Sequence, residues 1–449
     1  MFTRVDARGE PVNGASERAV ALYEKALAEL QCYRGDPVAT IDQALADSPD
    51  FAMAHCFRAY IHALSTEAQA VAETRASFDA AAALRTNARE RRHLVALRQF
   101  LDGSWEGAIA ALEDVLTDYP RDALALQAVH LADFYVGDAR NLRDHVARVL
   151  PEWSPDDSGY HALLGMYAFG LEESGDYRRA EEMGRRALEL NPRDAWAQHA
   201  VAHVMEMQGR AQDGIAWMNG RERDWAEDSF FAVHNWWHLA LFHLELDQTE
   251  RVLELYDGPL RGERSRVVLD LVDASALLWR LHLRGIDAGA RWSELADAWE
   301  PLATDGFYAF NDAHAMMAFV AGDRPKAAEA LLAAQQQAMA GGSGNARMTW
   351  EVGYPLCAGL RAFGRDDYAT CISLLRPLRS RLHRFGGSHA QRDVFDLTLL
   401  EAARRDGHHA LVRALANERI ERKPDSPLNR RYRQQAARAA AEAGGVAAL

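Results

Sequence analysis

The sequence predicts an all-α protein in which helix–turn–helix units stack into a right-handed superhelix, an α-solenoid. Three observations support this prediction. Apolar residues recur three and four positions apart along most of the 449 residues, and alternating strand patterns are hard to find. Short polar breaks interrupt the helical stretches at a nearly constant interval. One of the resulting units also matches a known repeat position by position.

The breaks between the predicted helices end in glycine or aspartate. The first two lie 68 residues apart, which is twice 34, and the later ones follow at intervals of 34 to 43 residues. A helix–turn–helix period of about 34 residues is typical of tetratricopeptide repeats, and the period predicts about nine or ten helix pairs. The break residues are Gly35, Gly103, Gly137, Gly175, Gly209, Asp247, Gly285, Gly322, Gly364 and Gly407.

The unit over residues 161–192 shows the repeat most clearly. With His161 at position 1, the small residues Ala168 and Ala180 fall at positions 8 and 20, where two helices must approach closely. Pro192 falls at position 32 and ends the second helix, because proline cannot extend one. The units after Asp247 are longer and match less closely.

The array is expected to be one domain over residues 15–430. Residues 1–14 are expected to be disordered, and "GGSGN" at 341–345 is expected to be a flexible connection. Residues 431–449 are expected to form a C-terminal helix followed by a frayed tail.

Composition excludes several classes of protein. The net charge of −14 disfavours a nucleic-acid-binding surface, which needs a basic stripe. The four cysteines form no CxxC pair and are expected to be free thiols, as in a reducing compartment. The N-terminus lacks the apolar run of a signal peptide, and no apolar stretch is long enough to span a membrane. These features predict a cytoplasmic protein with no membrane partner.

The repeat register assigns residues to the concave groove. In the unit beginning at Ala195, positions 2, 5, 9 and 12 face the groove. Small Gly165 in the preceding unit leaves space opposite His199. Histidine, carboxylate and aromatic side chains together predict a closed pocket for a small molecule or short peptide. The groove residues are Trp196, His199, His203, Glu206, His234, His238, Trp279, His282, Asp312 and Tyr354, with Ser275, Met316, Glu351 and Arg361 beside them.

The two HxxxH pairs, His199 with His203 and His234 with His238, form the strongest cluster. Each pair places two imidazoles on one helical face, so the four could bind one divalent transition metal, with Glu206 as a ligand or catalytic base. The same side chains could instead contact a ligand without metal, or form a hydrogen-bonded polar core. Asp273 could join the rim of the pocket, but ordinary helix packing is the favoured interpretation.

The stretch "GGSHAQRD" at 386–393 opens a late helix. Ser388 suits the N-cap, and His389, Gln391 and Asp393 follow in the first turn. The helix N-terminus could hold an anionic group of a ligand, or the cap could simply fix the path of the chain.

Four stretches, "DAWAQHAVAHVMEMQGR", "HNWWHLALFHLE", "DASALLWRLHLRG" and "GGSHAQRDVF", together resemble the tetratricopeptide repeat protein 38 family across roughly residues 15–430. The resemblance implies a soluble helical-repeat protein of a kind found in bacteria and animals, and it implies no established reaction. The motif positions that carry over are His199, His203, Glu206, His234, His238, Ser388, His389, Gln391 and Asp393.

Three functions therefore stay open. The first is a protein that binds a small ligand in a cavity lined by histidine and tryptophan. The second is a metal-dependent enzyme, for hydrolysis or oxidation, that uses the histidine cluster with Glu206 as base. The third is a protein–protein interaction scaffold. If the protein forms a homodimer, we expect its interface on the C-terminal repeats, which match the repeat pattern less closely.

Overall fold

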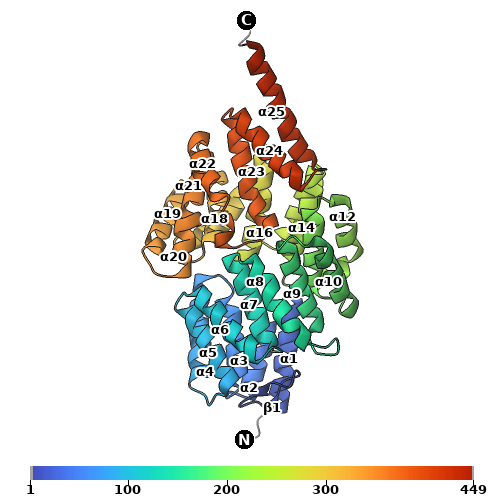
Figure 1. Cartoon of the computed structure of the whole chain (residues 1–449). Helices are drawn as coiled ribbons and strands as arrows, with labels where there is room; N and C mark the ends of the chain where they lie inside the picture. The colour runs from blue at the N-terminus through green and yellow to red at the C-terminus, as the bar shows by residue number, and fades with distance from the viewer. Residues whose placement is uncertain (1–3, 447–449) are drawn as a thin grey trace. The chain divides into compact units, whose positions relative to one another are not determined.

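The prediction of an all-α fold of stacked helix pairs is confirmed in a computed structural model (Figure 1). The structure describes the backbone of residues 4–446 and the side chains of residues 4–438. Contacts divide the chain into two compact units. Unit 1 comprises residues 4–201, 221–232 and 342–344, and unit 2 comprises residues 202–220, 233–341 and 345–446. Helix α11 (Ala195–Met207) runs across the division, which falls between Val201 and Ala202.

Unit 1 contains the helices before α11 and the short helix α13. Consecutive helices pack as hairpins, for example α9 against α10. The elements are β1 (Arg4–Val5), β2 (Pro11–Val12), α1 (Glu17–Cys32), α2 (Pro37–Asp47), α3 (Ala52–Ala63), α4 (Val71–Ala82), α5 (Ala88–Leu101), α6 (Trp105–Asp118), α7 (Ala123–Val136), α8 (Ala139–Val149), α9 (Tyr160–Glu173), α10 (Tyr177–Leu190) and α13 (Glu222–Trp225).

Unit 2 contains the later helices, which also pack as hairpins, for example α21 against α22 and α24 against α25. The helices are α12 (Ala211–Gly220), α14 (Ala232–Glu245), α15 (Thr249–Leu255), α16 (Val268–Leu283), α17 (Arg291–Trp299), α18 (Ala309–Ala321), α19 (Pro325–Met339), α20 (Gly344–Met348), α21 (Tyr354–Phe363), α22 (Tyr368–Leu375), α23 (His389–Arg405), α24 (His409–Arg422) and α25 (Pro427–Val446).

The predicted breaks are the turns between helices. Gly35, Gly137 and Gly175 have positive φ angles, which end a helix without the strain that a Cβ would add. The aspartate after each glycine then caps the next helix: the carboxylate of Asp36 accepts from the Ala39 N–H at 2.9 Å. Asp138 caps α8 in the same way. The Gly–Asp pair therefore encodes both the end of one helix and the start of the next.

Small residues let the helices of a pair approach closely. Ala168 of α9 and Ala180 of α10 are both fully buried, as the repeat register predicts. Gly170 of α9 lies so close to α8 that a Cβ there would be 2.4 Å from the Leu142 carbonyl oxygen. Such contacts fix the spacing of successive helices and leave the larger side chains to fill the space between them.

The N-terminal segment differs from the predicted disorder. From residue 4 onward it forms a short antiparallel pair, β1 with β2. Buried Arg89 of α5 reaches Asp6 in this segment at 3.2 Å and Asp122 at 2.6 Å. The ion pairs hold the segment against unit 1 and satisfy charges that could not be buried alone. Residues 1–3 and 447–449 of the predicted disordered ends lie outside the described residues.

The connection at 341–345 is docked rather than loose. The Gly344 N–H donates to the Gly103 carbonyl oxygen at 2.8 Å within unit 1. Glycine composition alone predicts flexibility, but this hydrogen bond ties the segment to the turn before α6.

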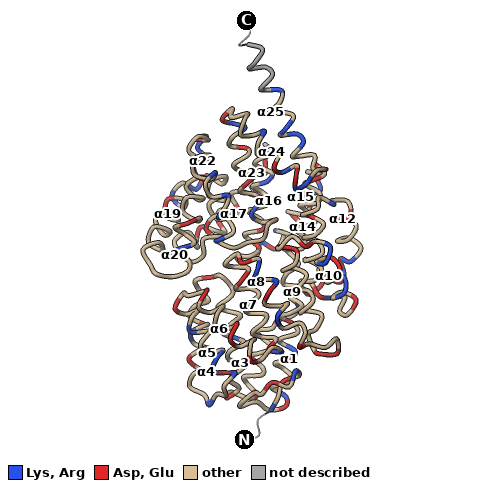
Figure 2. Tube along the Cα trace, in the orientation of Figure 1, with Lys and Arg blue, Asp and Glu red and all other residues tan. Residues whose placement is uncertain are grey.

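Acidic and basic residues are interspersed along the helices of both units (Figure 2). All four cysteines, Cys32, Cys56, Cys357 and Cys371, are buried and free, as the sequence predicts. Among the residues that the structure describes, no helix has the length and apolarity needed to cross a lipid bilayer.

Candidate metal centre

The candidate centre lies where α11 and α14 carry their HxxxH pairs. His203 of α11 and both His234 and His238 of α14 belong to unit 2, whereas His199 lies one turn before His203 on α11. An interval of four residues places two side chains on the same face of a helix, one above the other. The sequence therefore aligns each pair of imidazoles before any tertiary contact forms.

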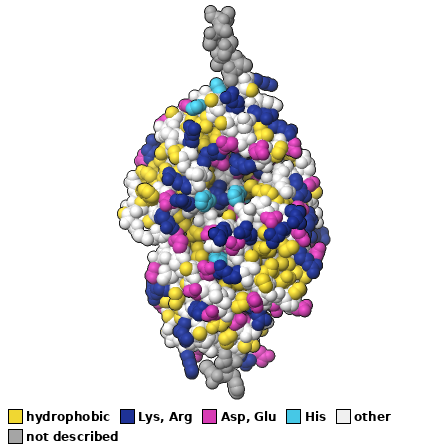
Figure 3. All heavy atoms as spheres, in the orientation of Figure 1, with side chains coloured by type: hydrophobic (Ala, Val, Ile, Leu, Met, Phe, Trp, Pro, Cys, Tyr) yellow, Lys and Arg dark blue, Asp and Glu magenta, His cyan; other side chains and the backbone are white. Residues whose placement is uncertain are grey.

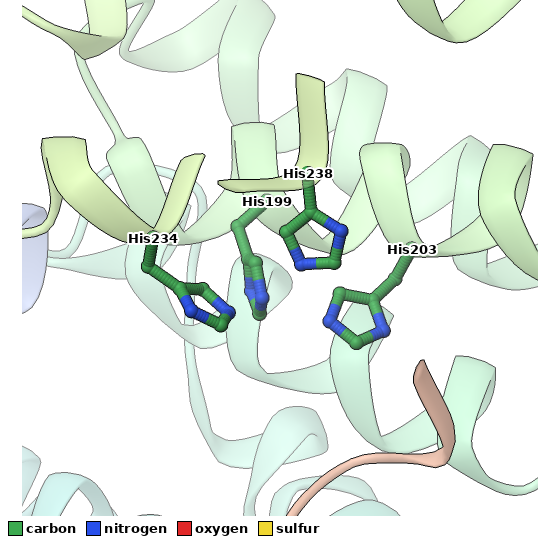
Figure 4. A group of neighbouring side chains, drawn as sticks. All are labelled: His199, His203, His234 and His238. Atoms are coloured by element: carbon green, nitrogen blue, oxygen red, sulfur yellow. The ribbon is translucent and has the colours of Figure 1, made fainter. Parts of the chain in front are cut away.

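The three imidazoles of unit 2 lie against one another. The ring centroids of His203 and His238 are 4.5 Å apart, and those of His234 and His238 are 5.0 Å apart. The side chains of His203 and His238 are fully buried, and that of His234 is 5% exposed. Figure 4 shows these rings together with that of His199. Each of the three histidines of unit 2 offers one ring nitrogen, and these nitrogens lie within 4.8 Å of one another.

A buried carboxylate orients His234. Both oxygens of Asp273, on α16, lie within hydrogen-bond distance of His234 Nδ1, at 2.8 and 3.0 Å. The Asp273 side chain is fully buried. A carboxylate at Nδ1 fixes the tautomer and leaves Nε2 as the nitrogen that can bind an electrophile. Carboxylate–histidine pairs of this kind support ligands in many metal sites.

A second carboxylate lies at His238. Glu206 Oε2, one helical turn beyond His203, is 3.4 Å from His238 Nδ1. The other Glu206 oxygen is 3.8 Å from the Lys423 ammonium group, which follows α24. Glu206 was predicted as a ligand or base. In the structure it lies between an imidazole and a lysine.

The environment of the cluster favours neutral imidazole. The pKa of His238 is held well below its ordinary value, first by burial and then by the neighbouring His203, His234, Arg280 and Lys423. Neutral imidazole is the form that coordinates metals. The residues present therefore match a nitrogen-rich transition-metal site in type, spacing and burial.

Most of the other predicted groove residues are placed in helix packing. Trp196 lies in unit 1, stacked on Tyr33 with ring centroids 5.3 Å apart. Trp279 of α16 is fully buried, and its Nε1–H donates to Thr398 of α23 at 2.9 Å. His282 lies 5.1 Å from the Trp279 ring. These contacts are those of a packed interior.

Two further predicted residues lie in the later pairs of unit 2. Asp312 of α18 is buried and accepts from the Gln335 amide at 3.1 Å, and burial raises its pKa to about 7. Tyr354, the first residue of α21, is half-buried, and its hydroxyl accepts from Gln336.

Ser388 caps α23, as the sequence predicts, and the cap is a capping box with Gln391. Ser388 Oγ accepts from the Gln391 N–H at 3.1 Å, and Gln391 Oε1 accepts from the Ser388 N–H at 3.0 Å. Asp393 forms a two-pronged ion pair with Arg419 of α24. His389 is exposed and lines a surface cavity. Capping and ion pairing thus account for Ser388, Gln391 and Asp393.

Sequence reasoning missed the residues that surround the cluster. Asp273 was interpreted as packing, although its position on α16, which opens the helix pair after α14 and α15, is the available signal. Arg280 of α16 is fully buried, and its guanidinium lies 5.3 Å from the Trp237 ring. Arg280 and Lys423 come from helices outside the HxxxH pairs, and no local motif marks them.

Comparison with known proteins gives no family assignment. No family's sequence model matches the chain. A structure of the human IFIT1 dimer with m7Gppp-AAAA is 13% identical, with 97% of this chain and 96% of that chain covered and a TM-score of 0.38. Naa15/Naa10 bound to HypK-THB is 12% identical, with 94% and 66% covered and a TM-score of 0.26. The TPR domain of P58(IPK) is 15% identical, with 87% and 98% covered and a TM-score of 0.20.

Proposed function

We propose that this helical-repeat protein binds a divalent transition metal ion, with imidazoles of His203, His234 and His238 as ligands and His199 on the adjoining turn of α11. The observation that carries the proposal is the buried Asp273–His234 pair, because a carboxylate on Nδ1 prepares the ring to ligate through Nε2.

The donor set favours a particular class of metal. Imidazole nitrogen suits zinc, copper, iron and nickel, whereas calcium and magnesium prefer oxygen ligands. In a tetrahedral zinc site the metal–nitrogen distances are about 2.0–2.1 Å, so ligand nitrogens lie roughly 3.4 Å apart. The cluster nitrogens lie within 4.8 Å of one another, so small ring rotations would close the site.

Metal-dependent catalysis is a second proposal. The Glu206 carboxylate lies beside the cluster and beside Lys423, as a proton acceptor for a metal-bound water would. Zinc binding without turnover of esters or phosphate esters would favour a purely binding role. Capture of small molecules without metal would favour the ligand-binding alternative. Recovery of a protein partner that no cluster substitution affects would favour a scaffold.

Membership of the tetratricopeptide repeat protein 38 family is likewise proposed, on the four quoted motifs. Those motifs contain the histidines of both HxxxH pairs and Glu206. If the resemblance is correct, metal binding is a property to test across that family.

The test of metal binding uses the full chain, expressed without a polyhistidine tag. We expect stoichiometric metal by elemental analysis, or saturable zinc binding after metal removal. His203→Gln combined with His234→Gln should abolish it. The matched control is His408→Gln combined with His409→Gln, which removes two histidines at the start of α24. Circular dichroism establishes that both variants fold.

Two results would overturn the proposal. One is a wild-type protein that neither contains metal nor binds zinc saturably. The other is equal zinc binding by the cluster variant and the control variant, because the zinc would then lie elsewhere.

A further inference from the structure

We propose that unit 2 contains a second site, a cavity that binds an oxyanion group, phosphate or carboxylate, of a small ligand. The cavity has a volume of about 190 Å³. It lies where the first turns of α23 meet the end of α24 and the end of α11, represented by His389, Arg422 and Met207. On the face shown in Figure 3, histidine, lysine and arginine side chains gather around a hollow.

The lining of this cavity is strongly basic. Five of its residues are cationic, namely Arg379, Arg392, Arg419, Arg422 and Lys423, against two acidic residues, Asp393 and Asp396. The lining thus carries a formal charge of +3 in a chain whose net charge is −14. A concave surface with one sign of charge concentrates the electric field and attracts ions of the opposite sign.

A buried cation lies directly behind the cavity wall. Arg280 is 4% exposed, and its guanidinium donates to the carbonyl oxygens of Ala276 at 3.0 Å and Ala390 at 2.7 Å. Ala390 is itself part of the cavity lining. Main-chain carbonyls carry only partial charge, so they satisfy the hydrogen bonds of a guanidinium without neutralising it.

The acidic groups near the cavity are already paired with basic side chains. Asp393 is held by both arms of Arg419, and Glu206 lies between His238 and Lys423. Asp396 is 3.2 Å from Arg379 and 3.8 Å from Arg422, and Glu418 is 2.6 Å from Arg379. These four carboxylates face six cations, the five of the lining and Arg280. The cations therefore outnumber the carboxylates, and an added oxyanion would compensate the excess.

The geometry also limits the ligand. Arginine forks bind phosphate and carboxylate oxygens in pairs of parallel hydrogen bonds, which favours a planar or tetrahedral oxyanion. Pockets for drug-sized molecules usually measure about 300–1,000 Å³, so this cavity suits a small ligand or one group of a larger one. The Arg422 side chain is 50% exposed, so the site can be reached from solvent.

The capping box argues against anion binding by the backbone N–H groups of the helix N-terminus alone. Because Ser388 and Gln391 engage each other's backbone N–H groups, the first turn of α23 offers fewer donors to an anion. Recognition must therefore come from the side chains of α24 and from Arg392. A reduction of side-chain charge should remove it.

The test is calorimetric titration of the metal-free full chain with inorganic phosphate, and separately with acetate, in buffer of constant ionic strength. We expect saturable phosphate binding that Arg422→Gln combined with Lys423→Gln weakens at least tenfold. The matched control is Arg185→Gln combined with Arg186→Gln on the exposed face of α10, which removes the same charge. Tighter binding of acetate than phosphate would assign the site to carboxylates.

The inference is overturned if phosphate and acetate produce no saturable heat, or if the two double variants bind equally. The second result would indicate general attraction to arginine on the surface. The titration uses metal-free protein, so its result can be interpreted even if the protein binds no metal. Conversely, zinc binding without oxyanion binding would overturn only this inference.

Discussion

Asp273→Asn tests the candidate centre without removing a ligand. Both Asp273 oxygens face His234 Nδ1, at 2.8 and 3.0 Å, in a fully buried setting. The substitution preserves shape and removes the negative charge. Its amide can also present N–H to Nδ1, which would place the imidazole proton on Nε2, the nitrogen needed for the metal. Either effect should weaken binding while the protein stays folded.

The expected magnitude follows from the role of such partners. Loss of the group that orients a ligating histidine typically lowers metal affinity about 10- to 100-fold. That change corresponds to about 1.4–2.7 kcal/mol of binding free energy. His234→Gln, which removes the ligand itself, should weaken zinc binding more than Asp273→Asn does. The order of the two variants is therefore part of the prediction.

The assay is zinc competition against a chromophoric chelator at neutral pH. Unit 1 contains a matched control, since Asp133 Oδ2 lies 2.7 Å from Nδ1 of buried His145, and Asp133→Asn makes the same change there. We expect wild-type zinc affinity in this control. Unchanged affinity in Asp273→Asn would refute the orienting role. An equal loss in both variants would indicate a general effect on folding.

Two further predictions concern the fold. Burial raises the pKa of Asp312 to about 7, so the native state retains a proton that the unfolded state has lost, and stability falls as pH rises from about 4 to 7. Asp312→Asn should remove that loss of stability, which is about 4 kcal/mol at most. Denaturant titrations should therefore show a variant more stable than the wild type at pH 8 and little different from it at pH 4. A stability difference that does not change with pH would contradict the burial argument. Gly170→Ala would place a Cβ 2.4 Å from a backbone oxygen and should cost about 1–3 kcal/mol in thermal unfolding. Gly220→Ala, with nothing within 4 Å of the new Cβ, should cost nothing, and equal effects would refute the contact argument.

The fold could be predicted because the residues that end one helix and start the next act locally. Eight of the ten predicted break residues have positive φ angles, and at the other two, Gly322 and Gly364, the positive φ occurs at Asp323 and Asp366 just beyond. Helix ends and caps depend on a few neighbouring residues. The ordered segment before α1 was missed because its stability comes from Arg89, more than 80 residues away in sequence.

The candidate centre could be predicted only as far as one helix determines it. The interval of four residues in each HxxxH pair predicted two aligned imidazoles. Asp273, 39 residues beyond His234, depends on how α16 packs against the rest of unit 2. Trp279 shows the converse, because the repeat register placed it in the groove while its indole hydrogen-bonds to Thr398, 119 residues later. A register specifies a helix face, whereas the neighbour of that face is set by tertiary packing.

Two of the buried arginines, one in each unit, differ in the groups that surround the guanidinium. Arg89 in unit 1 pairs with Asp6 and Asp122, and those partners raise its pKa against the effect of burial. Arg280 in unit 2 has carbonyl partners, and burial lowers its pKa. The chain can thus neutralise a buried guanidinium with its own carboxylates, as unit 1 demonstrates. The carboxylates of Asp393 and Glu206 act on Arg280 without ending the effect of burial. If the oxyanion proposed above binds in the adjoining cavity, phosphate should raise the melting temperature of the wild type but not of Arg422→Gln with Lys423→Gln.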